Sequence, residues 1–139
     1  MDENTRSLIA AIDRWRSQDI DEYWLSVSYM GPAVNRFGDH DLTFVDGRLW
    51  HSWEDGWREI AVGSDFWLFS VPGAFSWARD MLVKVLPGID GGLESIELAF
   101  NEMYGYVEYM RVRMGQRDTQ NFTFEVRRFG AGPHPNFEK

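Results

Sequence analysis

His51, Glu54 and Asp55 bring a base and two carboxylates together within five residues of the sequence. Histidine and acidic side chains transfer protons in many hydrolases, and both residue types also bind metal ions. His40 and Asp41 add two more potential ligands, but the set contains no i,i+4 pair on a predicted helix, so its spacing specifies no metal. The grouping therefore supports a secondary hypothesis only, a small hydrolase-like enzyme with an acid/base site near His51 and Glu54. No metal site is indicated.

The turn that precedes His51 favours a structural role for this residue. Asp46-Gly47 is a dipeptide that accepts the positive φ angles of a two-residue hairpin. With such a turn, Phe44 lies opposite Leu49 and Leu42 lies opposite His51. His51 then shares a strand face with apolar side chains, where a hydrogen-bonded interior histidine is the ordinary outcome.

Aromatic residues are concentrated between Trp50 and Phe69 and are interleaved there with charges. A core can absorb part of this set, and the remainder is suited to a contact surface or a cleft, because large rings give binding area at little entropic cost. The predicted ligand- or partner-binding residues are Trp50, Trp53, Trp57 and Trp67, together with Tyr104 and Tyr106 at a later turn. The leading hypothesis is therefore a non-catalytic binding or interaction domain.

Three kinds of occupant remain open for this predicted surface. They are a protein partner, a small apolar or glycan-like ligand, and an apolar ligand carried between the helices and a curved sheet. A homo-oligomer is also compatible with it. No motif indicates a cofactor, since the glycines between Gly88 and Gly92 are not followed by the lysine and helix of a phosphate-binding loop.

Composition limits the partners and the compartment. The formal net charge is −8 and cysteine is absent, so nucleic acid is disfavoured as a partner and thiol chemistry is excluded. No apolar run reaches the roughly 20 residues of a membrane helix. The start Met1-Asp2-Glu3-Asn4 lacks the features of a signal peptide. We expect a soluble, cytoplasmic protein as written, or an exported one if a leader has been removed.

Two amphipathic helices are predicted. The first spans residues 5–18, and the second spans 70–86, with Ser70 as its N-terminal cap and Pro87-Gly88 as its stop. Alternating patterns predict strands after each helix: from Glu22 to Met30, on both sides of Asp46-Gly47, over 57–62, and in three runs between Ile96 and Val126. The last two of these runs are separated by a predicted turn at 115–118.

This order predicts an α+β fold made of two helix-then-strands units. Strands joined by hairpins form an antiparallel sheet, and we expect both helices to pack on one face of it. The predicted domain spans residues 1–129. Residues 130–139 have neither period nor core residues and are predicted to form a flexible tail.

The part from Ser70 onward resembles a family of small bacterial proteins known as a domain of unknown function, many of them exported or lipid-anchored. The resemblance rests on matching positions spread over residues 70–129: Ser70-Val71, Ala74-Phe75, Phe100-Asn101, Gly105-Tyr106-Val107 and Phe122 to Phe129. Asn101 stands where that family has an acid, and Val107 stands where it has a proline. The resemblance implies an α+β domain and assigns no activity.

Overall fold

A computed structural model describes residues 2–32, 37–84, 93–114 and 121–138 of the chain. The side chains of Lys84, Leu93 and Glu94 are outside this description. The elements follow in the order α1 (Glu3–Arg16), β1 (Tyr23–Met30), β2 (Gly38–Val45), β3 (Arg48–Trp53), β4 (Gly56–Ile60), a 3-10 helix η2 (Asp65–Phe69), α2 (Val71–Lys84), β5 (Leu93–Phe100), β6 (Val107–Met114) and β7 (Phe122–Ala131).

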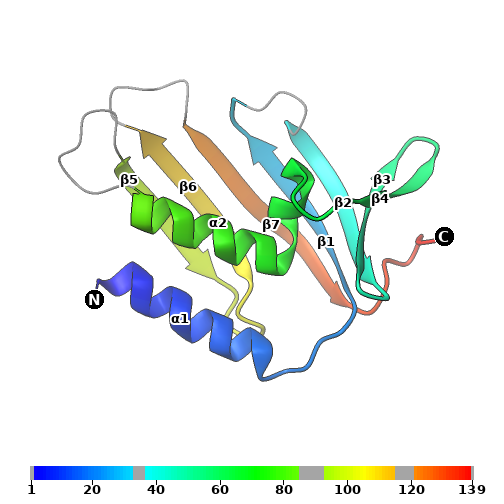
Figure 1. The fold of residues 1–139 in the computed structure, drawn as a ribbon, viewed down its shortest axis with the longest axis horizontal. Coiled ribbons are helices and arrows are strands. Elements are labelled where there is room, and N and C mark those ends of the chain that lie inside the picture. The colour runs from blue at the N-terminus through cyan, green and yellow to red at the C-terminus, as the bar shows by residue number, and fades with distance from the viewer. Residues whose placement is uncertain (1, 33–36, 85–92, 115–120, 139) are drawn as a thin grey trace.

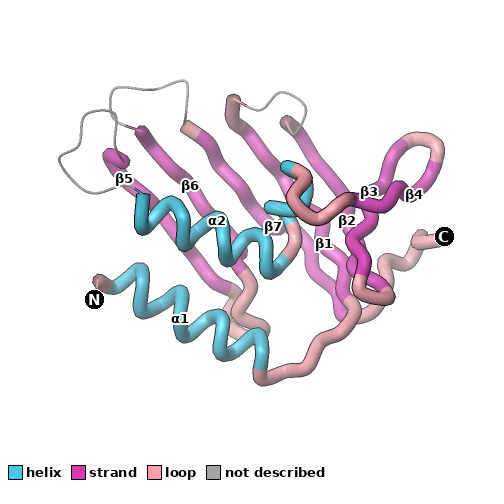
Figure 2. The backbone as a smooth tube through the Cα atoms, in the orientation of Figure 1, coloured by secondary structure: helices cyan, strands magenta, loops and turns pink. Residues whose placement is uncertain are grey.

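Within these residues, seven strands form one antiparallel sheet, in the order β4-β3-β2-β1-β7-β6-β5 (Figure 1). The predictions of an α+β fold and of an antiparallel sheet are confirmed. Four strands, β1 to β4, follow α1 before the chain reaches α2. The first and last strands are neighbours at the centre of the sheet, which joins the two halves of the chain into one layer (Figure 2).

Local sequence signals explain the helix starts. Asp2 accepts a hydrogen bond from the Thr5 amide at 2.8 Å and caps α1. Ser70 Oγ accepts a bond from the Gly73 amide at 3.0 Å, as predicted for the start of the second helix. The predicted stop of that helix at Pro87-Gly88, the glycines up to Gly92 and the predicted turn at 115–118 lie outside the described residues.

The hairpin prediction is confirmed in detail. Asp46 and Gly47 have φ values of 54° and 75°, the conformation of a tight two-residue turn. In the ladder, Phe44 pairs with Leu49 and Leu42 pairs with His51. The register therefore follows from the turn dipeptide alone.

The two faces of the sheet differ in what covers them. The Tyr23 face carries the buried residues of β1, and the Trp24 face carries the alternate residues. On the Tyr23 face, the Trp15 ring of α1 meets Tyr23 edge-on, with ring centroids 5.3 Å apart. The Val71 amide of α2 donates a hydrogen bond to Tyr23 Oη at 3.1 Å. Burial raises the pKa of Tyr23, so this phenol stays neutral.

The segment predicted as a flexible tail has two parts in the structure. β7 continues through Gly130 to Ala131, beyond the predicted domain boundary at residue 129. Residues 132–138 then lie against the Trp24 face, where the Gly132 amide donates to Glu22 O at 2.8 Å and the His134 amide donates to Thr43 Oγ1 at 3.0 Å. Sequence periodicity missed these contacts because they come from single side chains and not from a repeating pattern. The flexibility of the segment stays a prediction.

Candidate functional site

The structure divides the predicted binding residues among separate places. Trp50 pairs with Thr43 and belongs to the Trp24 face, whereas Trp53, three positions later, belongs to the Tyr23 face. Trp67 lies in η2, with its ring 6.4 Å from that of Phe44. An odd spacing along a strand always places two side chains on opposite faces. The alternation itself therefore carried the signal that Trp50 and Trp53 do not act together.

Tyr104 and Tyr106 lie in the turn between β5 and β6 and have structural contacts. Asn101 organises this turn, because its Oδ1 accepts bonds from the amides of Met103 and Tyr104 at 3.0 and 2.8 Å. Gln18, two residues beyond the end of α1, donates to the carbonyl oxygens of Met103 and Tyr104 at 3.1 and 3.0 Å. Through these hydrogen bonds, the β5–β6 turn anchors the chain at the C-terminal end of α1.

Burial removes Tyr106 from direct contact with an external ligand. Its side chain is 6% exposed, and its ring stacks on Phe129 at 4.7 Å. Burial, assisted by Glu108 and Tyr104, raises the pKa of Tyr106 to about 12. The hydroxyl accepts a bond from the Asn101 amide group at 3.2 Å.

His51 lies on the Tyr23 face near the end of the sheet and is 3% exposed. Its Nε2 is 2.8 Å from His40 Nδ1, so the two imidazoles share one hydrogen bond. The rings of Trp53 and Phe66 lie 4.7 and 4.8 Å from the His51 ring. Glu54 is exposed in the turn between β3 and β4. The hydrogen bond of the His51 side chain therefore joins it to a second histidine and not to the predicted carboxylate, Glu54.

The surroundings of His51 hold it in the neutral form. Burial, with a smaller contribution from His40, lowers the pKa of His51 to about 4, and Asp41 opposes this shift. Its Nδ1 is buried and finds no hydrogen-bond partner in the described part of the chain. Among the residues that the structure describes, no group of three or more His, Cys, Asp or Glu is placed to hold a metal ion.

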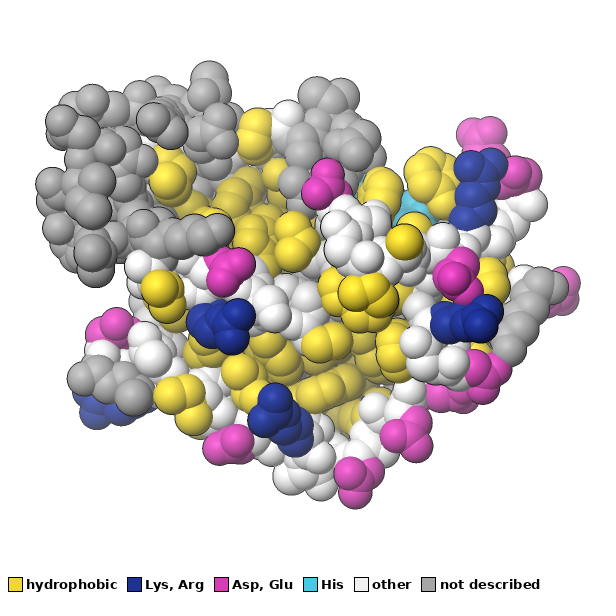
Figure 3. Space-filling model, viewed as in Figure 1, with side chains coloured by type: hydrophobic (Ala, Val, Ile, Leu, Met, Phe, Trp, Pro, Cys, Tyr) yellow, Lys and Arg dark blue, Asp and Glu magenta, His cyan; other side chains and the backbone are white. Residues whose placement is uncertain are grey.

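A groove of about 320 Å³ lies between α1 and α2. Figure 3 shows apolar side chains gathered between the two helices, with cationic side chains at the borders. The residues that line the groove are Ile12, Trp15, Arg16, Pro72, Phe75, Ser76 and Arg79. It combines aromatic walls with two guanidinium groups and contains no carboxylate or imidazole.

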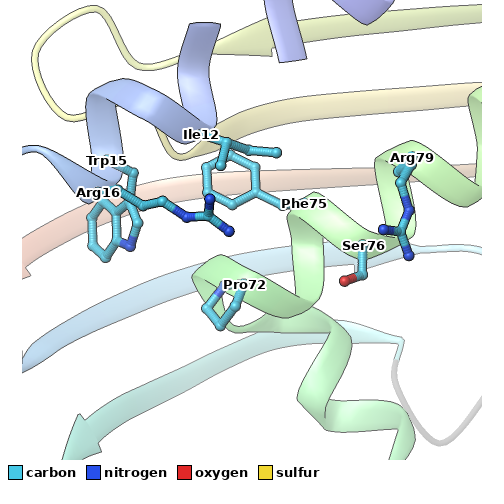
Figure 4. Close-up of a pocket in the computed structure, with 7 residues that line it drawn as sticks. All are labelled: Ile12, Trp15, Arg16, Pro72, Phe75, Ser76 and Arg79. Atoms are coloured by element: carbon cyan, nitrogen blue, oxygen red, sulfur yellow. The ribbon is translucent and has the colours of Figure 1, made fainter. Parts of the chain in front are cut away.

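The side chains in the groove come from one face of each helix. Figure 4 shows Arg16 extending from α1 toward α2, and the Phe75 ring extending from α2 toward α1 beside Ile12. Ser76 and Arg79 follow along α2. Trp15 and Phe75 lie on the apolar stripes of the two helices, and Arg79 lies beside the stripe of the second. The groove arises where these faces meet at an angle, which periodicity within a single helix does not specify.

The chain matches no profile of a known protein family, and no curated protein matches it. Among the described residues, no helix combines the length and the apolar character needed to cross a bilayer. Function must therefore be argued from the geometry.

Proposed function

We propose that this protein is a non-catalytic binding domain, and that the groove between α1 and α2 holds a small apolar ligand with one anionic group. The groove itself carries this proposal, because its volume of about 320 Å³ falls within the range of ligand pockets, roughly 300–1,000 Å³. Such pockets are mostly apolar, with a few polar groups that orient the ligand. The resemblance to the bacterial domain family remains a proposal as well and adds no ligand.

Charge supports an anionic ligand. The chain has a net charge of −8, yet the charged side chains of the groove are both arginines. Arg16 forms no ion pair within 4.0 Å among the described residues, and the partner of Arg79, Asp80, is 4.0 Å away with both side chains exposed. Guanidinium groups bind carboxylates through paired hydrogen bonds. A ligand carboxylate would therefore meet cations that have no strong partner.

The aromatic walls account for the apolar part of the ligand. Phe75 is 7% exposed, so its ring is a fixed part of the groove floor, and the larger aromatic contact area comes from Trp15. Trp15 is half-buried and is held edge-on against both Tyr23 and Phe129, at 5.3 and 5.9 Å. A ring fixed by its neighbours loses little conformational entropy when a ligand binds.

This binding mode uses an architecture of two helix-then-strands units with both helices on one face of the sheet. The contacts of Trp15 and Val71 with the same residue, Tyr23, support that arrangement. So does the position of α1 and α2 in front of the strands in Figure 1. The groove is then the seam between two helices that a common sheet supports.

The acid/base alternative at His51 and Glu54 has weaker support. Neutral His51 is enclosed by rings and bonded to His40, whereas general acid/base catalysis needs a group that reaches the substrate with a pKa near the working pH. The lining of the groove contains no such group. Binding is therefore the function that the geometry supports best.

The proposal is tested with octanoate and its uncharged analogue 1-octanol, titrated into the full chain by calorimetry. Octanoate should bind about tenfold more tightly, since one charge-assisted contact contributes roughly 1.5 kcal/mol. Arg16→Gln combined with Arg79→Gln should remove this preference and leave octanol binding unchanged.

The matched control is Arg6→Gln combined with Arg48→Gln, which removes the same charge outside the groove. It should keep the preference for octanoate. If neither compound binds, the groove is not a ligand site. If both double variants lose the preference for octanoate equally, that preference reflects the overall charge of the protein and not the groove.

A further inference from the structure

The Trp24 face carries a second aromatic surface, formed by Trp24, Trp50 and Trp57 and covered by the chain's own C-terminal segment. The His134 ring lies 4.9 Å from Trp24 and 5.2 Å from Trp57. The Phe137 ring lies 5.5 Å from both Trp50 and Trp57. The rings of His134 and Phe137 therefore pack among the three indoles of this surface.

The segment binds as a β-turn. The Phe137 amide donates to His134 O at 2.9 Å, which closes a four-residue turn from His134 to Phe137. The Asn136 amide donates to His134 Nδ1 at 3.1 Å and reinforces it. Pro135 occupies the second position, where its fixed φ angle favours the turn. The two rings therefore stand at the first and fourth positions of a preorganised unit.

The surface recognises the backbone of this turn as well as its rings. Trp57 Nε1 donates to Asn136 O at 3.0 Å. The His134 amide donates to Thr43 Oγ1, whose hydroxyl in turn donates to Tyr23 O at 3.1 Å. These two bonds fix the position of the turn backbone and would serve any turn of the same shape.

One donor of the surface is left unsatisfied by the internal turn. Trp50 Nε1 is buried and has no hydrogen-bond partner among the residues that the structure describes. A buried donor without an acceptor is costly, and most such groups in native proteins find one. A bound segment that places a carbonyl oxygen at Trp50 Nε1 gains a bond that the chain's own segment does not make.

We propose that the surface of Trp24, Trp50 and Trp57 recognises proline-centred β-turns with ring side chains at the first and fourth positions. The turn at 134–137 is its internal occupant, and the partner is a segment of another protein with the same turn chemistry. The internal turn is tethered, which gives it an effective concentration in the millimolar range. A partner displaces it by adding the acceptor for Trp50.

The test uses the synthetic peptide Gly-Pro-His-Pro-Asn-Phe-Glu, which is residues 132–138 of the chain, and the full chain with His134→Ala and Phe137→Ala. These substitutions free the surface, so the peptide should bind one to one, at least tenfold more tightly than it binds the parent chain. Tryptophan emission reports the binding. Replacing the peptide's phenylalanine by alanine, or its second proline by glycine, should weaken binding several-fold.

Two variants of the surface distinguish specific recognition of the turn from nonspecific covering of the indoles. Trp57→Phe keeps a ring but removes the donor to the turn, and should weaken the peptide several-fold. Trp50→Phe should leave this peptide's affinity unchanged, because the indole N–H forms no bond to the turn. Equal losses for both variants would overturn the specific recognition proposed.

A third measurement does not depend on the folding of the alanine variant. The parent chain is prepared with 4-fluorophenylalanine in place of Phe137, and excess peptide should move its fluorine signal toward that of a solvated ring. A signal that is unchanged at millimolar peptide overturns the proposal, since the segment is then a fixed part of the fold. A concentration-dependent dimer that the peptide dissociates would identify a second copy as the occupant and overturn the assignment to another protein.

Discussion

The two faces of the sheet both bury rings around a histidine, but their covers differ. On the Tyr23 face, Phe69 is fully buried and its ring lies within 5.7 Å of those of Tyr29, His40 and Phe124. On the Trp24 face, Phe137 is half-buried and belongs to a segment of a few residues. The 3-10 helix η2, which carries Phe69, is itself part of the core, so it covers the Tyr23 face permanently. A short turn held by two rings and a few hydrogen bonds makes one that another segment can replace.

The same truncation on each face gives the largest expected contrast. Phe69→Ala should lower the free energy of unfolding by about 3–5 kcal/mol, because it leaves a cavity among packed rings. Phe137→Ala should cost about 1 kcal/mol, the size of its aromatic contacts. Urea denaturation of both variants measures the difference. Equal losses would show that the C-terminal segment is as much a part of the core as η2.

Acidification should act through the histidine of the Tyr23 face. The pKa of His51 is about 4 in the folded chain and about 6.5 when unfolded. The unfolded chain therefore binds more protons between these values, and stability falls as the pH drops from about 6.5 to 4. The loss attributable to His51 should approach roughly 3 kcal/mol at the lower end.

Denaturant melts across this pH range check the effect, with His51→Phe as the control. The phenylalanine ring fills the site without titrating and should flatten this part of the pH profile. The neighbours that also shift the pKa of His51 are His40, which lowers it, and Asp41, which raises it. A profile that is unchanged in the variant would assign the pH dependence to other groups.

Fluorescence quenching should separate exposed rings from covered ones. Trp53 is 41% exposed, with the Arg58 guanidinium 5.2 Å from its ring. Trp53→Phe should therefore remove much of the iodide-quenchable emission while the melting temperature changes by no more than a few degrees. Trp50→Phe and Trp57→Phe should remove less, because the C-terminal segment covers these rings.

The smallest expected effect concerns the groove. Arg16 is exposed and has no ion pair among the described residues. Arg16→Gln should therefore change the free energy of unfolding by less than about 0.5 kcal/mol. A larger loss in thermal melts would mean that Arg16 supports the packing of the two helices and is not reserved for a ligand.

Short-range sequence patterns specify the local elements and part of the assignment of side chains to sheet faces. The turn dipeptide Asp46-Gly47 fixed the register that puts His51 opposite Leu42, because turn geometry and strand alternation act over only a few residues. The cap at Ser70 and the apolar stripes of both helices were predictable for the same reason. The same alternation separates Trp50 from Trp53, although composition alone suggested one aromatic cluster.

Tertiary structure decided what no short-range pattern contains. The pairing of β1 with β7 joins residues about a hundred positions apart, and it brings the C-terminal segment next to Trp24. The groove that Arg16 and Arg79 line exists only because α1 and α2, from different parts of the chain, lie next to each other. These features depend on long-range packing, where many side chains contribute small energies together, and so they become visible only once the chain has folded.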